Sequence, residues 1–267
     1  MLASLLRWLP LLAILMTAAG CASTPDTAVG QFQARAVHVD GRTAYYQVFV
    51  PAAAARAAGP LPVVLFLHGS GERGSDGVKQ THAGIGPYLR AHAGEFPALV
   101  VLPQVPGEQE WAGDNNRVAV AALDATMAEF GADPARQYLT GMSMGGYGSW
   151  NIALADPGRF AAIVPVCGAV LAPRAVRQSL FVEAVAAEAD PYTALASRLK
   201  QVPVWLFHGA LDDVVLPDDD RRLFAAFKAV GARDARYTEY PDGNHNAWDA
   251  TYGDAAMWDW MFAQKRQ

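Results

Sequence analysis

Short apolar runs alternate along this chain with longer segments whose apolar residues recur at helical spacing. The continuous runs at Leu61–Leu67, Pro97–Leu102, Phe160–Val166 and Val202–Phe207 are typical of strands buried on both faces of a parallel sheet. Further strands are predicted at Ala44–Pro51, Gln137–Thr140 and Ala235–Tyr240, and helices at Asn116–Phe130, Met144–Ala155, Leu223–Val230 and Ala255–Gln264.

Strands that alternate with helices require crossover connections, which predicts a mostly parallel sheet in an α/β fold. No helical pattern separates Ala44–Pro51 from Leu61–Leu67, so we expect this first pair of strands to be antiparallel. The irregular stretch Gly168–Ser197 is interpreted as an insertion over one edge of the sheet, and the sequence leaves open whether it is a lid. Since no repeat or linker divides the rest, we expect a single domain.

The composition excludes several classes of protein. The chain has 267 residues, of which 52% are hydrophobic and 18% charged, a balance that is typical of a folded protein with a large core. The net charge is −5 and there is no basic patch, so nucleic acid is not an expected partner. Cys21 and Cys167 are the only cysteines, too few for a disulfide framework, and their spacing predicts no metal site.

Residues 1–20 read as a secretory signal peptide of the lipoprotein type, with one cation, a short apolar run and then small residues. The sequence from Ala18 to Cys21 resembles a bacterial lipobox, although Ala18 stands where leucine is usual. That resemblance implies lipidation of Cys21, and Ala22 after it implies sorting to the outer membrane. The alternative is an ordinary cleaved signal. Residues 21–31 are expected to form a tether, and 32–267 the catalytic domain of an exported, envelope-bound protein.

The stretch with the clearest chemistry is Gly141–Gly145, which reads GMSMG and fits the G-x-S-x-G pattern. A predicted strand precedes it and a predicted helix follows. A nucleophile elbow needs this context, because its serine occupies a strained turn that projects the hydroxyl out of the sheet. Side chains at either glycine would collide with the neighbouring strand and helix. Ser143 is therefore the candidate nucleophile.

A serine hydroxyl needs a base beside it and a group that orients the base. In hydrolases with such an elbow, the acid and then the histidine follow the serine along the chain. Of the two downstream histidines, His245 lies in a turn-rich loop and is the candidate base, whereas His208 ends a buried strand and is interpreted as structural. Asp212 is preferred to Asp213 as the acid. The run 218–220 is interpreted as solvated charge at a helix start.

An oxyanion hole requires backbone N–H groups aimed at the attacked carbonyl oxygen. Met144 offers one, directly after the nucleophile. The glycine-rich loop after Leu61–Leu67 is expected to offer the other, from Ser70 or alternatively Gly71. Glu72 and Arg73 in that loop are interpreted as a local ion pair, with direct substrate contact as the alternative.

Taken together, these motifs resemble those of the α/β-hydrolases. The narrower resemblance is to bacterial esterases near the feruloyl esterase, polyhydroxybutyrate depolymerase and "predicted peptidase" groups of prolyl oligopeptidase-like hydrolases. It rests on LFLHGSGERGSD (65–76), HAGIGPYL (82–89), LPQVPGEQEW (102–111), YLTGMSMGGYGSW (138–150), WLFHGALDDVV (205–215) and the His245–Trp248 loop. The resemblance implies a sheet of about eight strands flanked by helices, and it also places the acid at Asp212.

Trp111 and Trp248 fall in loops near strand ends, where substrate pockets lie in such folds, and are candidate substrate-binding residues. Packing under a loop is the alternative for both.

The resulting hypothesis is an exported serine carboxylesterase that acts on a small-molecule or polymer ester through an acyl-enzyme, with no cofactor. Its membrane contact would be limited to the lipid anchor. One alternative is a peptidase of the same superfamily, although 267 residues leave no room for the propeller that such peptidases usually carry. The other is a non-catalytic binding lipoprotein, a class that typically lacks a triad member, whereas all three are present here.

Overall fold

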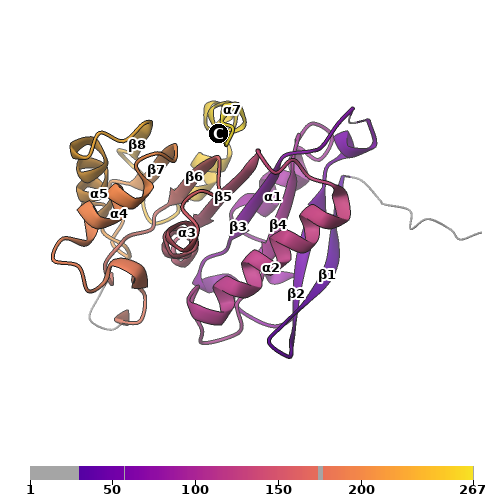
Figure 1. Ribbon diagram of the computed structural model, residues 1–267, viewed down its shortest axis with the longest axis horizontal. Coiled ribbons are helices and arrows are strands. Elements are labelled where there is room, and N and C mark those ends of the chain that lie inside the picture. Colours follow the sequence, from indigo (N-terminus) through magenta and orange to yellow (C-terminus); the bar gives the residue numbers. More distant parts are fainter. Residues whose placement is uncertain (1–29, 57, 174–176, 267) are drawn as a thin grey trace, which may run out of the picture.

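One eight-stranded sheet organises the protein. The computed structural model describes residues 30–56, 58–173 and 177–266, and its strands lie in the order β1-β2-β4-β3-β5-β6-β7-β8 (Figure 1). The expected α/β fold with a mostly parallel sheet in a single domain is confirmed. The strands are β1 Gln31–Val39, β2 Arg42–Val50, β3 Val63–Leu67, β4 Leu99–Pro103, β5 Gln137–Met142, β6 Ala162–Val166, β7 Val204–Gly209 and β8 Ala235–Tyr240.

The antiparallel part of the sheet differs from the prediction. β2 pairs antiparallel with β1 and with β4, but not with β3, the next strand along the chain. β3 lies between β4 and β5 and is parallel to both. The order follows from the crossover connections. Helix α1 (Ile85–Ala91) connects β3 to β4, which lies on one side of β3, and helix α2 (Gly113–Phe130) connects β4 to β5, which lies on the other side. β4 therefore stands between β3 and β2.

The edge strand β1 was not predicted. Its residues alternate between exposed and half-buried, because only one neighbour and the helix α2 cover it. It begins at Gln31, so the last residue of the expected tether lies in the sheet. Residues 1–20, predicted to be a signal peptide, and Cys21 lie outside the described residues.

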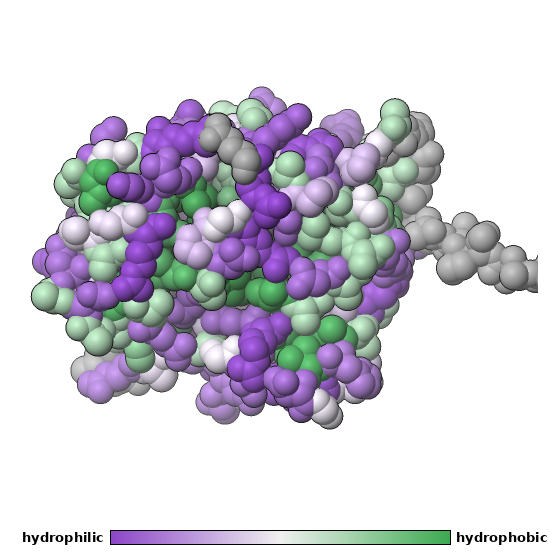
Figure 2. Space-filling model, in the orientation of Figure 1, coloured by the Kyte–Doolittle hydropathy of each residue, from purple (hydrophilic) through white to green (hydrophobic). Residues whose placement is uncertain are grey.

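Helices cover both faces of the sheet (Figure 1). The helices α2, α3 (Met144–Ala155), α4 (Pro191–Leu199) and α5 (Asp218–Ala229) pack on one face, and α1, α6 (Trp248–Tyr252) and α7 (Ala255–Ala263) on the other. The strands divide accordingly: Val63, Leu65 and Leu67 face the first set, Val64 and Phe66 the second, as the two-residue period of a strand dictates. Figure 2 shows the first face, where polar residues surround a hollow with hydrophobic residues.

The described residues of the stretch 168–197 belong to this helical layer and do not form an insertion over a sheet edge. Its apolar residues Leu180, Val182, Val185 and Leu195 are buried in the core cluster on the first face. Within it, α4 packs against α3 and α5. The part of the chain that the structure describes contains no helix that is both long and apolar enough to cross a membrane.

Trp111 is a core residue, which corrects the expectation that it binds substrate. Its side chain is 2% exposed, and its indole N–H donates to the backbone oxygen of His68 at 2.9 Å. A Cβ at position 148 would lie 2.5 Å from the Cβ of Trp111, so Gly148 allows α3 to pack against the tryptophan. Trp111 therefore supports the loop after β3 from below.

We predict that Trp111→Ala lowers the free energy of unfolding by about 3–5 kcal/mol, because it opens a cavity and leaves a buried carbonyl without its donor. Urea denaturation followed by circular dichroism measures the change. Tyr45→Ala is the matched control, since Tyr45 is 61% exposed and its loss should change stability by only about 0.5 kcal/mol. Equal effects of the two substitutions would contradict the core role of Trp111.

Candidate active site

Ser143 occupies a strained turn between β5, which ends at Met142, and α3, which begins at Met144. Its backbone has φ 53° and ψ −117°, a conformation that residues with a side chain rarely adopt. The flanking glycines are required by close packing: a Cβ at position 141 would stand 2.3 Å from the oxygen of Gly145, and one at 145 would stand 1.9 Å from the oxygen of Leu67. The local geometry is that of a nucleophile elbow.

The structure brings together the three side chains that the sequence singled out. The Oγ of Ser143 lies 2.9 Å from Nε2 of His245, and Nδ1 of His245 lies 2.7 Å from Oδ2 of Asp212. A carboxylate only accepts hydrogen bonds, so Nδ1 carries the proton and Nε2 is free to accept from the serine hydroxyl. Loops after β5, β7 and β8 supply the three residues, which meet at the carboxyl end of the sheet.

Asp212, and not Asp213, contacts the histidine. Asp212 is 3% exposed, whereas Asp213 is exposed. Its Oδ1 accepts two backbone hydrogen bonds, from the N–H groups of Val214 and Val215, both at 2.9 Å. Burial on its own would raise the pKa of Asp212, but hydrogen bonds from His208, His245 and Val215 outweigh it and hold the pKa well below its usual value. The carboxylate is therefore ionised at neutral pH.

The backbone donors expected for an oxyanion hole flank the serine. The N–H of Met144 begins α3, where helix geometry leaves the first amides without intrahelical partners. Ser70 and Gly71 line the pocket at Ser143 from the opposite loop. Which of them donates stays a prediction.

The loop after β3 is held in place from several sides. The Nε2 of His68 accepts from the N–H of Val105 at 3.0 Å, and burial lowers the pKa of this histidine to about 4, so it is neutral. Arg73 donates to the backbone oxygens of Ser70 and Gln109, at 3.1 and 3.3 Å. These bonds place Arg73 on backbone carbonyls rather than in the expected ion pair with Glu72.

The pocket above Ser143 has a volume of about 280 Å³. Trp248 lines it and stands edge-on to His245, with ring centroids 5.6 Å apart. Two charged residues also line it: Glu72, for which substrate contact is the alternative interpretation of the sequence, and Arg177, which the sequence analysis does not single out. Glu72 has a pKa raised by burial, and Arg177 is paired with Glu110 at 2.8 Å. A wider groove of about 760 Å³ lies between α2 and α3 and does not include Ser143.

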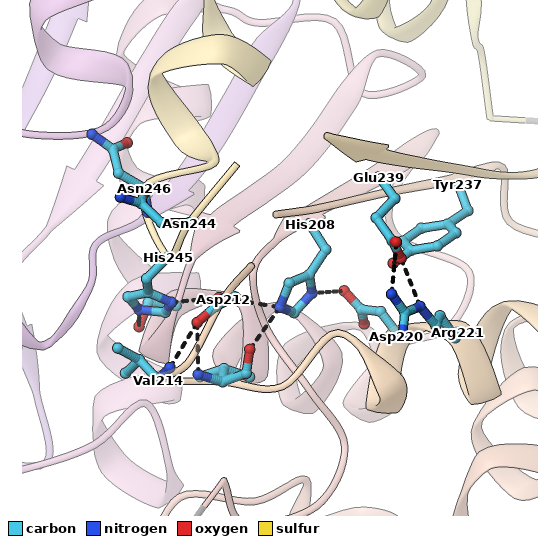
Figure 3. Close-up of polar contacts among 12 residues, drawn as sticks. His208, Asp212, Val214, Asp220, Arg221, Tyr237, Glu239, Asn244, His245 and Asn246 are labelled. Carbon is cyan, nitrogen blue, oxygen red and sulfur yellow. Dashed lines mark hydrogen bonds and ion pairs between the residues drawn. The ribbon is translucent and has the colours of Figure 1, made fainter. Parts of the chain in front are cut away.

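A second group of buried polar residues adjoins Asp212 (Figure 3). His208, which was expected to be structural, and Asp220, which was expected to be solvated, are both fully buried and hydrogen-bonded to each other. Asp219 accepts from the N–H groups of Val170 and Leu171, so of the run 218–220 only Asp218 is fully exposed. The signal that could have found Asp220 is helical spacing, because it precedes the buried Leu223 and Phe227 by three and seven residues and so lies on the side of α5 that faces the sheet.

Cys167 is the third potential metal ligand near Asp212 and His245, with ligand atoms within 4.8 Å of one another. Burial raises the pKa of its thiol well above the usual value, so it stays protonated. Since Asp212 and His245 are already bonded to each other, these residues do not present a free ligand set.

Esterases and a peptidase of known structure share the fold of this protein. The chain resembles a thermostable esterase of known structure, with 28% identity and a TM-score of 0.71 over 89% of this chain and 64% of that one. It also resembles a ferulic acid esterase, with 16% identity and a TM-score of 0.66 over 87% of this chain and 98% of that one. An acylaminoacyl peptidase from Pyrococcus horikoshii shows 18% identity and a TM-score of 0.60, over 80% of this chain and 38% of that one.

The chain thus spans less than two thirds of the length of the esterase and of the peptidase. The comparison with curated proteins found no match. Residues 107–265, more than half of the chain and the part that carries Ser143, Asp212 and His245, match the Prolyl oligopeptidase family. With the α/β-hydrolase architecture described above, this match shows that the chain belongs to the prolyl oligopeptidase family.

Proposed function

We propose that the protein is a serine hydrolase that cleaves carboxylic esters. The observation that carries the proposal is the hydrogen-bonded chain from Ser143 through His245 to Asp212, with distances of 2.9 and 2.7 Å. This series of hydrogen bonds makes the weakly nucleophilic serine hydroxyl reactive, because the imidazole can accept the hydroxyl proton as the oxygen attacks.

In the proposed reaction, Oγ of Ser143 attacks the ester carbonyl while Nε2 of His245 takes the hydroxyl proton. The C–O bond to the alcohol then breaks, and His245 gives the same proton to the leaving oxygen. Water attacks the resulting acyl-serine in the same manner and releases the acid. Asp212, ionised and bonded to Nδ1, holds the imidazole in position and stabilises its charged form. The N–H groups of Met144 and Ser70 would stabilise the oxyanion.

Two features favour ester substrates over peptides. The thermostable esterase shares 28% identity with this chain, more than the acylaminoacyl peptidase shares. The pocket at Ser143 is small, and it is lined by the half-buried Trp248 and by Val214, which is 43% exposed. Leu211 and Leu216, on the same loop as Val214 and the candidate acid, are also exposed, and such apolar side chains suit an apolar acyl or alcohol group.

A substrate panel separates the two functions. Purified protein is assayed with three kinds of ester: p-nitrophenyl acetate and butyrate, feruloyl esters and hydroxybutyrate esters. It is also assayed with acylaminoacyl p-nitroanilides, which are amide substrates for peptidases. Turnover of esters with little or no amide cleavage is expected. Amide cleavage as fast as ester cleavage would favour the peptidase, the second candidate function, which the family match supports.

We predict that Ser143→Ala lowers kcat by about 10⁴-fold or more, because triad members act as a unit. A fluorophosphonate probe should label the wild type at Ser143 and leave the variant unlabelled, as detected by peptide mass spectrometry. Ser149→Ala is the control: this serine lies on α3 and bonds back to the oxygen of Gly145. Near-normal turnover of Ser143→Ala would falsify the nucleophile assignment.

The two neighbouring acids should differ sharply. Asp212→Asn is expected to lower kcat by about 10³- to 10⁴-fold, since an amide cannot hold His245 with Nδ1 protonated and stabilise its positive charge. Asp213→Asn should change kcat little, because Asp213 is exposed. Steady-state kinetics on a p-nitrophenyl ester measures both. The reverse ranking would move the acid by one residue.

We also propose that the protein is exported and anchored to the bacterial envelope through a lipid on Cys21, on the basis of the sequence of residues 1–31. Metabolic labelling with a palmitate analogue should mark the wild type but not Cys21→Ala. Cell fractionation should move the variant from the membrane to the soluble fraction. A wild type that is unlabelled and fully soluble would overturn this part of the proposal.

A further inference from the structure

The candidate acid has an imidazole on each side. Oδ2 of Asp212 lies 2.7 Å from Nδ1 of His245 and 3.2 Å from Nε2 of His208. His208 is held in turn by Asp220, whose Oδ2 lies 2.8 Å from Nδ1. Figure 3 shows the four side chains in one line from the loop after β8, past the loop after β7, to helix α5.

The proton positions in this line follow from the partners. Nε2 of His208 faces only acceptors, Oδ2 of Asp212 and the backbone oxygen of Val215 at 2.9 Å, so it carries a proton and donates. A second proton lies in the hydrogen bond between Nδ1 of His208 and Oδ2 of Asp220. Burial opposes a charge on this histidine, but its bonds to Asp212 and Asp220 outweigh burial and raise the pKa of His208 to about 10. The donor toward Asp212 is thus present throughout the neutral range.

Burying these ionisable side chains in the core costs free energy of folding. His208 and Asp220 are fully buried and Asp212 is 3% exposed. Oδ1 of Asp220 has no hydrogen-bond partner among the described residues. Burying a carboxylate carries a large desolvation penalty, and apolar side chains of similar volume are often at least as stable in such a place. Stability is therefore a poor explanation for this buried pair of His208 and Asp220.

We propose that His208 and Asp220 are a positioning pair for the reaction: Asp220 orients the ring of His208, and His208 ties Asp212 to the Val215 carbonyl so that Oδ2 stays aimed at His245. Asp220 acts on His208 as Asp212 acts on His245, one step further from the substrate. The inference rests on the proposed function, in which Asp212 orients the base.

The test is a double-mutant cycle between Asp220 and Asp212 on the full chain. Asp220→Asn keeps the shape of the side chain and removes the carboxylate that orients His208. It should lower kcat for a p-nitrophenyl ester by about 10- to 100-fold with little change in KM, the scale of a small misplacement of a catalytic group. In the Asp212→Asn background the same substitution should cause no further loss, because the residue it acts through is already gone.

Asp219→Asn is the matched control. It removes a largely buried carboxylate from the same helix turn, but one that bonds Val170, Leu171 and Tyr192 instead of His208. It should leave kcat essentially unchanged. His208→Asn gives a second route if Asp220→Asn does not fold: its amide can still bond Asp220 but is too short to reach Asp212, and it should show the same loss of kcat in the same cycle.

Proton NMR of the histidine ring N–H groups supplies a readout that does not need turnover. The low-field Nδ1–H signal of His245 should shift or broaden in Asp220→Asn and stay unchanged in Asp219→Asn. Unchanged kcat in Asp220→Asn, an equal loss with and without Asp212, or an unaltered His245 signal would each overturn the inference. A wild type that turns over no ester and is not labelled by the probe would instead overturn the proposed function, while the NMR comparison would still decide the positioning role.

Discussion

The close contact between the elbow at Ser143 and the strand beside it is the constraint on which the site depends. Gly145 packs so tightly against the backbone oxygen of Leu67 that a side chain there would stand 1.9 Å from it. This contact holds α3 against the end of β3 and keeps Ser143 in a left-handed conformation with φ 53°. The hydroxyl is therefore presented above the sheet by the backbone, with no need for hydrogen bonds from its own side chain to hold it there.

The parallel order of the sheet does the rest of the assembly. β5, β7 and β8 all run in one direction, so their carboxyl ends open on the same edge and their loops meet there. Ser143 and His245 are 102 positions apart in the chain, and His245 and Asp212 are 33 apart, yet both pairs are within hydrogen-bond distance. The loops are further supported from below by buried groups such as Trp111 under His68.

Polar side chains next to the candidate active site are buried at core positions where apolar side chains are usual. Asp212, His208 and Asp220 form a buried relay whose members each have charged or polar partners. A group of this kind is stable only when its hydrogen bonds are made with good geometry, and it then specifies one arrangement. This explains how a loop position such as Asp212 attains the rigidity that orientation of an imidazole demands.

From local patterns alone (apolar runs, helical spacing and glycines around a turn), the sequence predicts the α/β class and the strands from β2 onward. It also singles out Ser143, His245 and Asp212 as candidates, and the fold brings their side chains together. The sequence did not determine that β2 pairs with β4, that Trp111 is core, that Glu72 and Arg177 line the pocket or that Asp220 is buried against His208. Pairing depends on the path of the crossovers, and burial of a side chain depends on which neighbours pack over it. These features emerge only once the chain is folded, because the sheet, and not spacing along the chain, brings the residues involved together.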